Sequence, residues 1–197
     1  PTTKKTLVMR APTGAGKTII LIKYIDRLLS SDKNIAVVWL CPGKGDLEEQ
    51  SRDKMKQVIP SRPTKDLFDA LSQGFLRGST TFLNWERVTK KDNRAITDSE
   101  TDNLYDKIKQ AQNNGIKFYI ILDEEHTNNT AKANTLLRFF SAEHTIRVSA
   151  TTVSNKDTVE FYEINEQDVI DEGLITSAIS VNEGVDDGIA QDFIRVS

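Results

Sequence analysis

Short apolar runs alternate along the chain with longer stretches in which apolar residues recur every three or four positions. The runs at residues 35–40 and 118–122 contain no charged residue, which predicts strands covered on both faces of a sheet. Residues 17–29 space their isoleucines and leucines mostly at three- and four-residue steps, which predicts a helix. Strand and helix therefore alternate in this part of the chain.

The remaining predicted elements follow the same alternation, with strands at residues 7–9, 80–85, 146–149, 159–164 and 178–181 and helices at 47–58, 104–111, 134–140 and 166–173. The polar residues 91–103 predict a surface loop. Alternating strands and helices predict an α/β fold, in which a mostly parallel sheet is covered by helices on both faces. Because no linker, low-complexity segment or internal repeat interrupts the pattern, we expect residues 1–197 to form a single domain.

The charges are distributed unevenly, although the net charge is only −3. Residues 163–192 carry nine acidic and no basic side chains, whereas residues 1–162 carry a net charge of +5. The first part therefore permits contact with a polyanion, and the acidic tail is unsuited to facing phosphates. Cys41 is the only cysteine, which excludes an intrachain disulfide and a cysteine zinc cluster. We expect it to act as a small hydrophobic residue at a strand end.

The apolar runs are too short for a membrane protein, since a spanning helix needs about 20 apolar residues. The N-terminal residues lead into only a three-residue apolar run, so we predict no signal peptide. These features predict no membrane contact and a reducing, cytoplasmic location.

Residues 11–18 read Ala-Pro-Thr-Gly-Ala-Gly-Lys-Thr and lie between a predicted strand and a predicted helix. Gly14 and Gly16 allow the backbone to curl so that its N–H groups point at phosphate oxygens. Lys17 would place a cation on the β- and γ-phosphates, and the Thr18 hydroxyl would bind Mg²⁺. The alternative is a glycine-rich turn with a solvated lysine, which the spacing and context disfavour. The predicted nucleotide-binding residues are Pro12, Thr13, Gly14, Ala15, Gly16, Lys17 and Thr18.

Two acidic residues, Asp123 and Glu124, follow the apolar run at 118–122, where ligands bind in open parallel sheets. Because strand side chains alternate, we expect Asp123 to act on Mg²⁺ and Glu124 to deprotonate the attacking water. Taken alone, the two acidic residues could simply be a solvated strand end. The phosphate-binding loop elsewhere in the chain favours the functional interpretation. A zinc-protease motif is excluded, because no second histidine lies four residues from His126. His144 is expected at the surface or at a helix end.

Three segments resemble motifs I, II and III of superfamily two (DEAD/DEAH-like) helicases and translocases, namely residues 11–18, Asp123-Glu124-Glu125-His126 and Ser149-Ala150-Thr151. Residues 41–44 with 47–50 resemble motif Ia. Asn84-Trp85-Glu86 and residues 169–175 are similar to the restriction (Res) subunit of type III restriction enzymes. The resemblance spans nearly the whole chain and implies a RecA-like P-loop NTPase domain, the first of two motor domains.

The resemblance implies roles that the residues alone do not supply. His126, Ser149, Ala150 and Thr151 would couple the nucleotide state to domain movement, although residues 149–151 alone fit a plain strand end. Pro42, Gly43 and Lys44 would lie along the backbone of a nucleic acid, which we expect to be double-stranded DNA. A plain strand-to-helix turn is the alternative for these three residues. Trp85 is expected in the core. The implied cofactors are ATP and Mg²⁺. Specificity for the adenine base is inferred only from the resemblance to this family.

Two departures from the family pattern limit the activity expected of this chain. Glu125 replaces the alanine more typical of motif II. Residues 152–197 contain no second motor-domain pattern and no nuclease signature, so the second motor domain, and a nuclease domain if the protein has one, would lie beyond Ser197. The resemblance also implies a modification (methyltransferase) subunit as a partner of the restriction type. An arginine supplied by a second domain is typically worth about 10³–10⁵ in rate, so the chain alone should hydrolyse ATP slowly.

Two other classes of protein stay open on the sequence. A nucleotide kinase or signalling NTPase would share residues 11–18 but would not need residues 149–151. A regulatory module with an idle nucleotide site would not need the complete set Lys17, Thr18, Asp123 and Glu124.

Overall fold

The computed structural model describes residues 5–12, 14–42, 46–89, 104–123, 131–149, 160–164, 167, 179–181 and 194–196. Over these residues the chain builds a seven-stranded sheet with the order β3-β4-β2-β5-β6-β1-β7, in which every neighbouring pair is parallel. The strands are β1 (Lys5–Arg10), β2 (Ile35–Cys41), β3 (Thr64–Lys65), β4 (Thr80–Asn84), β5 (Lys117–Asp123), β6 (His144–Ser149) and β7 (Glu160–Glu163). The predicted parallel α/β fold is confirmed.

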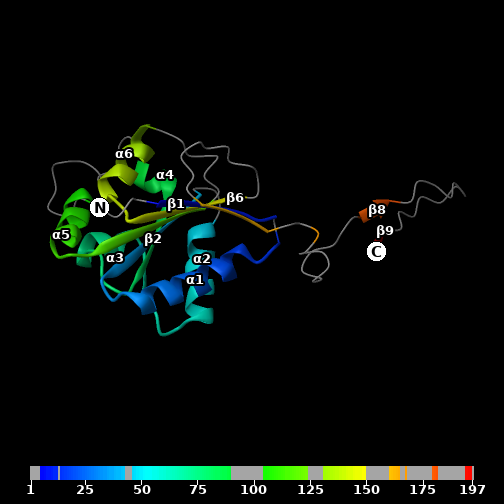
Figure 1. The fold of residues 1–197 in the computed structure, drawn as a ribbon, viewed down its shortest axis with the longest axis horizontal. Coiled ribbons are helices and arrows are strands. Elements are labelled where there is room, and N and C mark those ends of the chain that lie inside the picture. The colour runs from blue at the N-terminus through cyan, green and yellow to red at the C-terminus, as the bar shows by residue number, and fades with distance from the viewer. Residues whose placement is uncertain are drawn as a thin grey trace, which may run out of the picture.

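Among the described residues, six helices cover the two faces of this sheet (Figure 1). They are α1 (Lys17–Ser31), α2 (Leu47–Val58), α3 (Leu67–Gln73), α4 (Trp85–Thr89), α5 (Leu104–Asn113) and α6 (Ala131–Phe140). Buried residues of α1 and α2 form one hydrophobic cluster with the sheet, and those of α3 to α6 form a second cluster. We call these the α1/α2 face and the opposite face.

Strand β2 lies at the centre of the core, and all seven of its residues are buried. Its side chains alternate between the two clusters: Val37, Trp39 and Cys41 belong to the α1/α2 face, whereas Val38 and Leu40 belong to the opposite face. Burying a large apolar side chain contributes about 1.5–3 kcal/mol, which explains why the run at 35–40 carries no polar residue. Because β2 is apolar on both faces, it is stable only where helices pack on both sides of the sheet, as they do here.

Helix α1 shows how the apolar spacing becomes packing. Leu21, Ile22, Ile25 and Leu29 recur at one-, three- and four-residue steps and are all buried on the sheet. The remaining face is polar or partly exposed, so helix and sheet share one apolar stripe. The helix stops at Asp32, whose backbone is extended.

Two predicted positions are corrected by the structure. The strand predicted at residues 80–85 ends at Asn84, because Trp85 already begins α4; its ring is buried, as expected for a core residue. The placement of His144 at the surface or a helix end is wrong. His144 opens strand β6, is half-buried, and stacks on the Tyr119 ring with a centroid distance of 5.0 Å.

Several elements were not predicted from the sequence. Strand β3, helix α3 and helix α4 are too short to show a hydrophobic period. Strands β8 (Ile179–Val181) and β9 (Ile194–Val196) form a separate antiparallel pair, and β9 was not predicted. The loop predicted at 91–103 and nearly all of the helix predicted at 166–173 lie outside the described residues. Among the helices that are described, none has the length and apolarity that crossing a membrane requires.

Candidate nucleotide-binding site

The loop that joins β1 to α1, which we call the phosphate loop (residues 11–16), depends on its two glycines. Gly14 and Gly16 have φ angles of 87° and 72°. This left-handed region costs other residues about 1–2 kcal/mol, so glycine suits both positions. Between them Ala15 is buried, and its N–H donates to the Pro12 carbonyl at 3.3 Å. The loop therefore turns tightly and leads directly into α1.

The N-terminus of α1 is built to accept an anion. Gly16 is its N-cap residue, and no side chain caps the helix there. The first turn carries no acidic residue. A Cβ added at Gly16 would meet nothing within 4 Å, so the space beside Gly16 is open. An uncapped helix start with a positive dipole and open space beside it is the arrangement that binds phosphate.

Lys17 and Thr18 form the first two positions of α1. The Lys17 ammonium donates to the carbonyl of Ala11 at 3.2 Å, so its side chain folds back over the phosphate loop. Both side chains are half-buried. Lys17 and Thr18, which were predicted to bind phosphate and Mg²⁺, therefore directly follow the glycine-rich turn that contains Gly14 and Gly16.

The last segment of the described sheet supports this loop from the side. Strand β7 pairs with β1, and the N–H of Ile164 donates to the Arg10 carbonyl at 2.8 Å. Ile164 also packs against Ala11 and Ala15, and Glu163 forms an ion pair of 2.7 Å with Arg10. Residues more than 150 positions downstream therefore hold the base of the phosphate loop.

Asp123 is the last residue of β5 and lies in register with the end of β1. It pairs with Val148 on β6, and Val148 pairs with Met9 on β1. On the other side of β5, the ladder pair Leu40–Leu122 brings the next residues, Cys41 and Asp123, side by side.

The pairing of Cys41 with Asn84 on β4 extends this alignment across five strands. We call Asn84, Cys41, Asp123, Val148 and Met9 the terminal row. Met9, Cys41 and Val148 all belong to the α1/α2 face, and side-chain alternation places Asp123 there too. Strands lie about 4.8 Å apart, so the two steps from β5 to β1 span about 10 Å. The acidic strand end and the phosphate loop thus share one edge and one face of the sheet.

The structure locates part of the predicted site. Ser149 ends β6 and pairs with Arg10, so motif III follows the strand between the loop and Asp123. Pro42 directly follows β2 and is buried. Seven other predicted residues lie outside the described part of the chain: Thr13, Gly43, Lys44, Glu124, His126, Ala150 and Thr151.

The donor set suits magnesium bound mainly through phosphate. Within the described ranges, no group of three or more histidine, cysteine, aspartate or glutamate side chains could hold a metal ion alone. Mg²⁺ usually keeps several waters and binds through one or two protein oxygens plus substrate phosphates. The Thr18 hydroxyl and the Asp123 carboxylate match that requirement, since both are hard oxygen donors.

A second pocket, which sequence analysis missed, lies at the same edge of the sheet beside β4. It has a volume of about 410 Å³. Its lining includes the carboxylates Asp46, Glu48, Glu49 and Asp66 and the guanidinium groups of Arg52 and Arg87. The segments that form it are the N-terminal halves of α2 and α3, the end of β4 and helix α4, which no local pattern connects.

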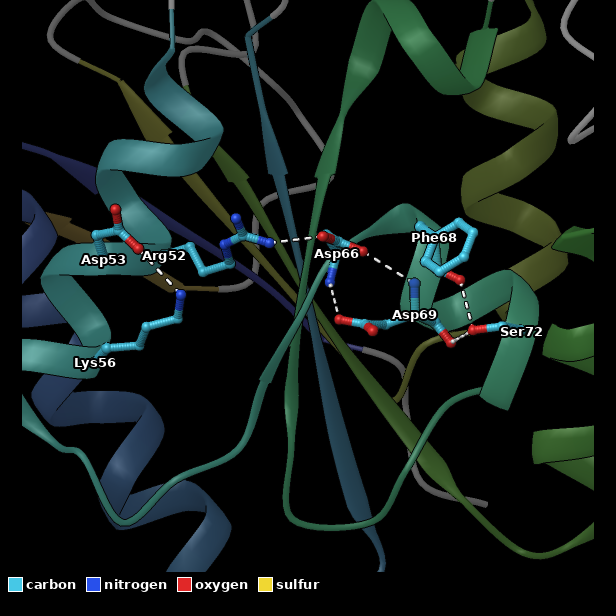
Figure 2. Close-up of polar contacts among 7 residues, drawn as sticks. All are labelled: Arg52, Asp53, Lys56, Asp66, Phe68, Asp69 and Ser72. Atoms are coloured by element: carbon cyan, nitrogen blue, oxygen red, sulfur yellow. Dashed lines mark hydrogen bonds and ion pairs between the residues drawn. The ribbon is translucent and has the colours of Figure 1, made fainter.

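Figure 2 shows how side chains fix the α2 and α3 walls of this pocket. Arg52 of α2 forms an ion pair of 2.7 Å with Asp66, the N-cap residue of α3. Asp66 also accepts from the Asp69 N–H at 2.9 Å, and the Asp69 carboxylate accepts from the Asp66 N–H at 3.2 Å. Partial burial opposes the ionised form, but the Asp69 N–H and Arg52 outweigh it and lower the pKa of Asp66. The spacing Asp66-x-x-Asp69 was the sequence signal for this cap.

Two further side chains give the pocket its character. Burial raises the pKa of Glu48, while the nearby Arg87 and Arg52 charges act in the opposite direction. Phe68 lies at the rim with 77% of its side chain exposed, which is unusual for a large aromatic residue. The pocket is therefore mixed in charge and acidic on balance, in contrast to the phosphate loop.

Comparison with solved structures identifies the fold. The chain resembles the SWI2/SNF2 ATPase core of Sulfolobus solfataricus in complex with dsDNA, with a TM-score of 0.54 and 15% identity, over 77% of this chain and 29% of the other. It resembles a nuclease-deletion mutant of the type ISP restriction-modification enzyme LlaGI bound to a DNA substrate mimic, with a TM-score of 0.57 and 13% identity, over 87% and 19% of the chains. The DUF1998 helicase MrfA gives a TM-score of 0.54 and 17% identity, over 82% and 28%.

These similarities define a class and a family. The fold is the RecA-like α/β fold of helicase ATPase cores, and the chain spans less than a third of the length of these three proteins. A model of the type III restriction enzyme res subunit matches residues 2–154, so the chain belongs to that family. No curated protein matches the chain.

Proposed function

We propose that the chain is the ATP-binding and ATP-hydrolysing motor domain of a nucleic-acid-dependent helicase or translocase, of the Res-subunit type. The observation that carries the proposal is the terminal row, which aligns Asp123 with the end of β1 on the face that α1 covers. The uncapped start of α1 then lies where the phosphates of a nucleotide would bind. Family membership independently supports this function.

The proposed roles follow the chemistry of each group. Backbone N–H groups of the phosphate loop and the Lys17 ammonium bind the β- and γ-phosphates. The Thr18 hydroxyl and the Asp123 carboxylate hold Mg²⁺, which when bound neutralises charge on those phosphates. Glu124 accepts the proton of the attacking water. Ser149, with Ala150, Thr151 and His126, would link the nucleotide to domain movement.

The polymer and the partners are part of the same proposal. Pro42, Gly43 and Lys44 follow β2 at the carboxyl edge and would contact the backbone of double-stranded DNA. Two of the similar solved structures were determined with DNA or a DNA mimic, which supports this choice of polymer. A second motor domain would supply an arginine, and a methyltransferase subunit would be the partner in a restriction enzyme.

The test is ATP turnover by the complete protein with and without nucleic acid. We expect double-stranded DNA to stimulate turnover more than single-stranded DNA or RNA of equal length. A nucleotide kinase would instead need a nucleoside monophosphate acceptor and would ignore DNA. Turnover that no nucleic acid changes would contradict the proposal.

A further inference from the structure

Cys41 occupies the middle of the polar part of the terminal row. Asn84 pairs with it on β4, and Asp123 lies beside it on β5. The Cys41 side chain is 0% exposed. Helix α2 packs on the same face of the sheet, and its buried Met55 belongs to the same hydrophobic cluster as Cys41. A buried thiol thus separates the two polar side chains, and Asp123 belongs to the proposed nucleotide site.

The chemistry of a thiol suits this place. Asp123 must stay ionised and available to bind magnesium, so a strong hydrogen-bond donor or a cation beside it would compete with the metal. A thiol is only a weak donor. The side chain fills space next to the carboxylate without engaging it strongly.

We propose that Cys41 is a positioning residue, which fills the space between Asn84 and Asp123 in the terminal row and holds Asp123 toward the nucleotide while donating only weakly to the carboxylate. The inference deepens the proposed function and rests on it, because it assumes that Asp123 takes part in binding magnesium-ATP. Cys41 touches neither substrate nor metal in this scheme. Its influence would act through the place and availability of the Asp123 carboxylate.

The test is equilibrium binding of a fluorescent ATP analogue to the complete protein across a series of Mg²⁺ concentrations. In Cys41→Ser the hydroxyl is a stronger donor, so we expect the half-saturating Mg²⁺ concentration to rise about three- to ten-fold. Binding measured without Mg²⁺ should stay unchanged. Cys41→Ala, which removes the contact without adding a donor, should shift the Mg²⁺ dependence less than Cys41→Ser.

The matched control is Val37→Ala, four residues earlier on the same strand and the same face, and also fully buried. It should lower the thermal unfolding temperature without moving the Mg²⁺ dependence. Lost volume alone would make alanine at position 41 the more disruptive change, since alanine is smaller than serine. We expect the Mg²⁺ dependence to shift more in Cys41→Ser than in Cys41→Ala, which is the reverse of the order that loss of packing volume alone would produce.

The outcomes separate the inference from the proposed function. If the wild type binds the analogue, Lys17→Ala weakens binding, and both Cys41 variants show the wild-type Mg²⁺ dependence, the inference is overturned and the nucleotide site stands. If the wild type does not bind the analogue, or Lys17→Ala binds equally well, the proposed function fails and the inference with it.

Discussion

Helices α1 and α3 both begin at the carboxyl edge of the sheet, but their N-termini are completed in different ways. At α1 the N-cap is Gly16, with a left-handed backbone and no capping side chain. At α3 the N-cap is Asp66, which forms a complete capping box with Asp69 and an ion pair with Arg52. Asp66 accepts from the Asp69 N–H at the start of α3, whereas no side chain caps the start of α1.

This difference shows which helix start is a candidate ligand site. A carboxylate at a helix N-terminus stabilises the helix and at the same time fills the position that an external anion would take. Helix α2 follows the pattern of α3 in part, since Glu48 and Glu49 lie in its first turn. Of the three, only α1 combines an uncapped start with a following lysine and threonine, as a phosphate site requires.

The largest effects are expected from the two residues assigned to the chemistry. Lys17→Ala and Glu124→Gln should each reduce ATP turnover in the complete protein by about 10²–10³-fold or more, because each removes a group that acts on the transition state. Lys17→Ala should also weaken ATP binding, whereas Glu124→Gln should leave binding measurable. Steady-state turnover and nucleotide binding check both.

The control for charge is Lys56→Ala, which removes a half-exposed lysine of α2 that pairs with Asp53. Turnover should stay within about two-fold of the wild type, because exposed ion pairs contribute little. Equal loss of binding in Lys17→Ala and Glu124→Gln would contradict the division of roles.

The second prediction compares two glycines that both have a positive φ and open space beside them. Gly16 and Gly74 have φ angles of 72° and 75°, and a Cβ would meet nothing within 4 Å at either. Alanine should cost about 1–2 kcal/mol in the free energy of unfolding at Gly16. It should cost more at Gly74, because the ψ angle of −176° there belongs to a region that only glycine readily adopts. Only Gly16→Ala should also weaken magnesium-ATP binding, by about ten-fold, which nucleotide titration would detect. Equal binding by the two variants would remove Gly16 from the site.

The third prediction concerns the self-capped helix. Asp66→Ala removes both the N-cap and the Arg52 ion pair, so it should destabilise the protein by about 1–2 kcal/mol. Asp66→Asn keeps a good N-cap and loses mainly the charge, so its cost should be smaller. Urea unfolding measures both, and nucleotide binding should be unchanged in each. Weakened ATP binding in Asp66→Asn would show that the two edge sites are coupled.

The smallest effect is a pH dependence at the same residue. The pKa of Asp66 lies below its ordinary value of 3.8 in the folded protein, so the unfolded chain takes up the proton first. This stabilisation is present above the ordinary pKa and is lost as the pH falls through the lower, folded pKa. The stability difference between wild type and Asp66→Asn should therefore shrink between pH 5 and pH 2, roughly. A difference that stays constant over that range would exclude the ion pair as its source.

Local features of the molecule were predictable from the sequence. Helix α2 occupies the predicted residues 47–58, and the phosphate loop joins β1 to α1 as its glycine spacing indicated. Cys41 is the predicted small buried residue at a strand end. These features depend on neighbours within a few positions, so periodicity and turn chemistry suffice.

Features that depend on distant segments were not predictable. The terminal row arises from the register of five strands, and the second pocket arises from α2, α3 and β4 together. His144 was misplaced because we expected β6 to begin at its first apolar residue, Ile146. The strand begins two residues earlier, where His144 pairs with Lys5 of β1. Helix α3 has only seven residues, so its capping residues were a clearer signal than its hydrophobic pattern.

The position of β7 beside β1 has a consequence for the order of events during synthesis. Ile164 and Glu163 brace a loop whose own residues leave the ribosome about 150 positions earlier. At about 5–20 residues per second, that interval lasts roughly 8–30 s. The nucleotide loop on the nascent chain therefore stays unbraced during that interval, and it gains its lateral support among the last contacts of the described sheet to form.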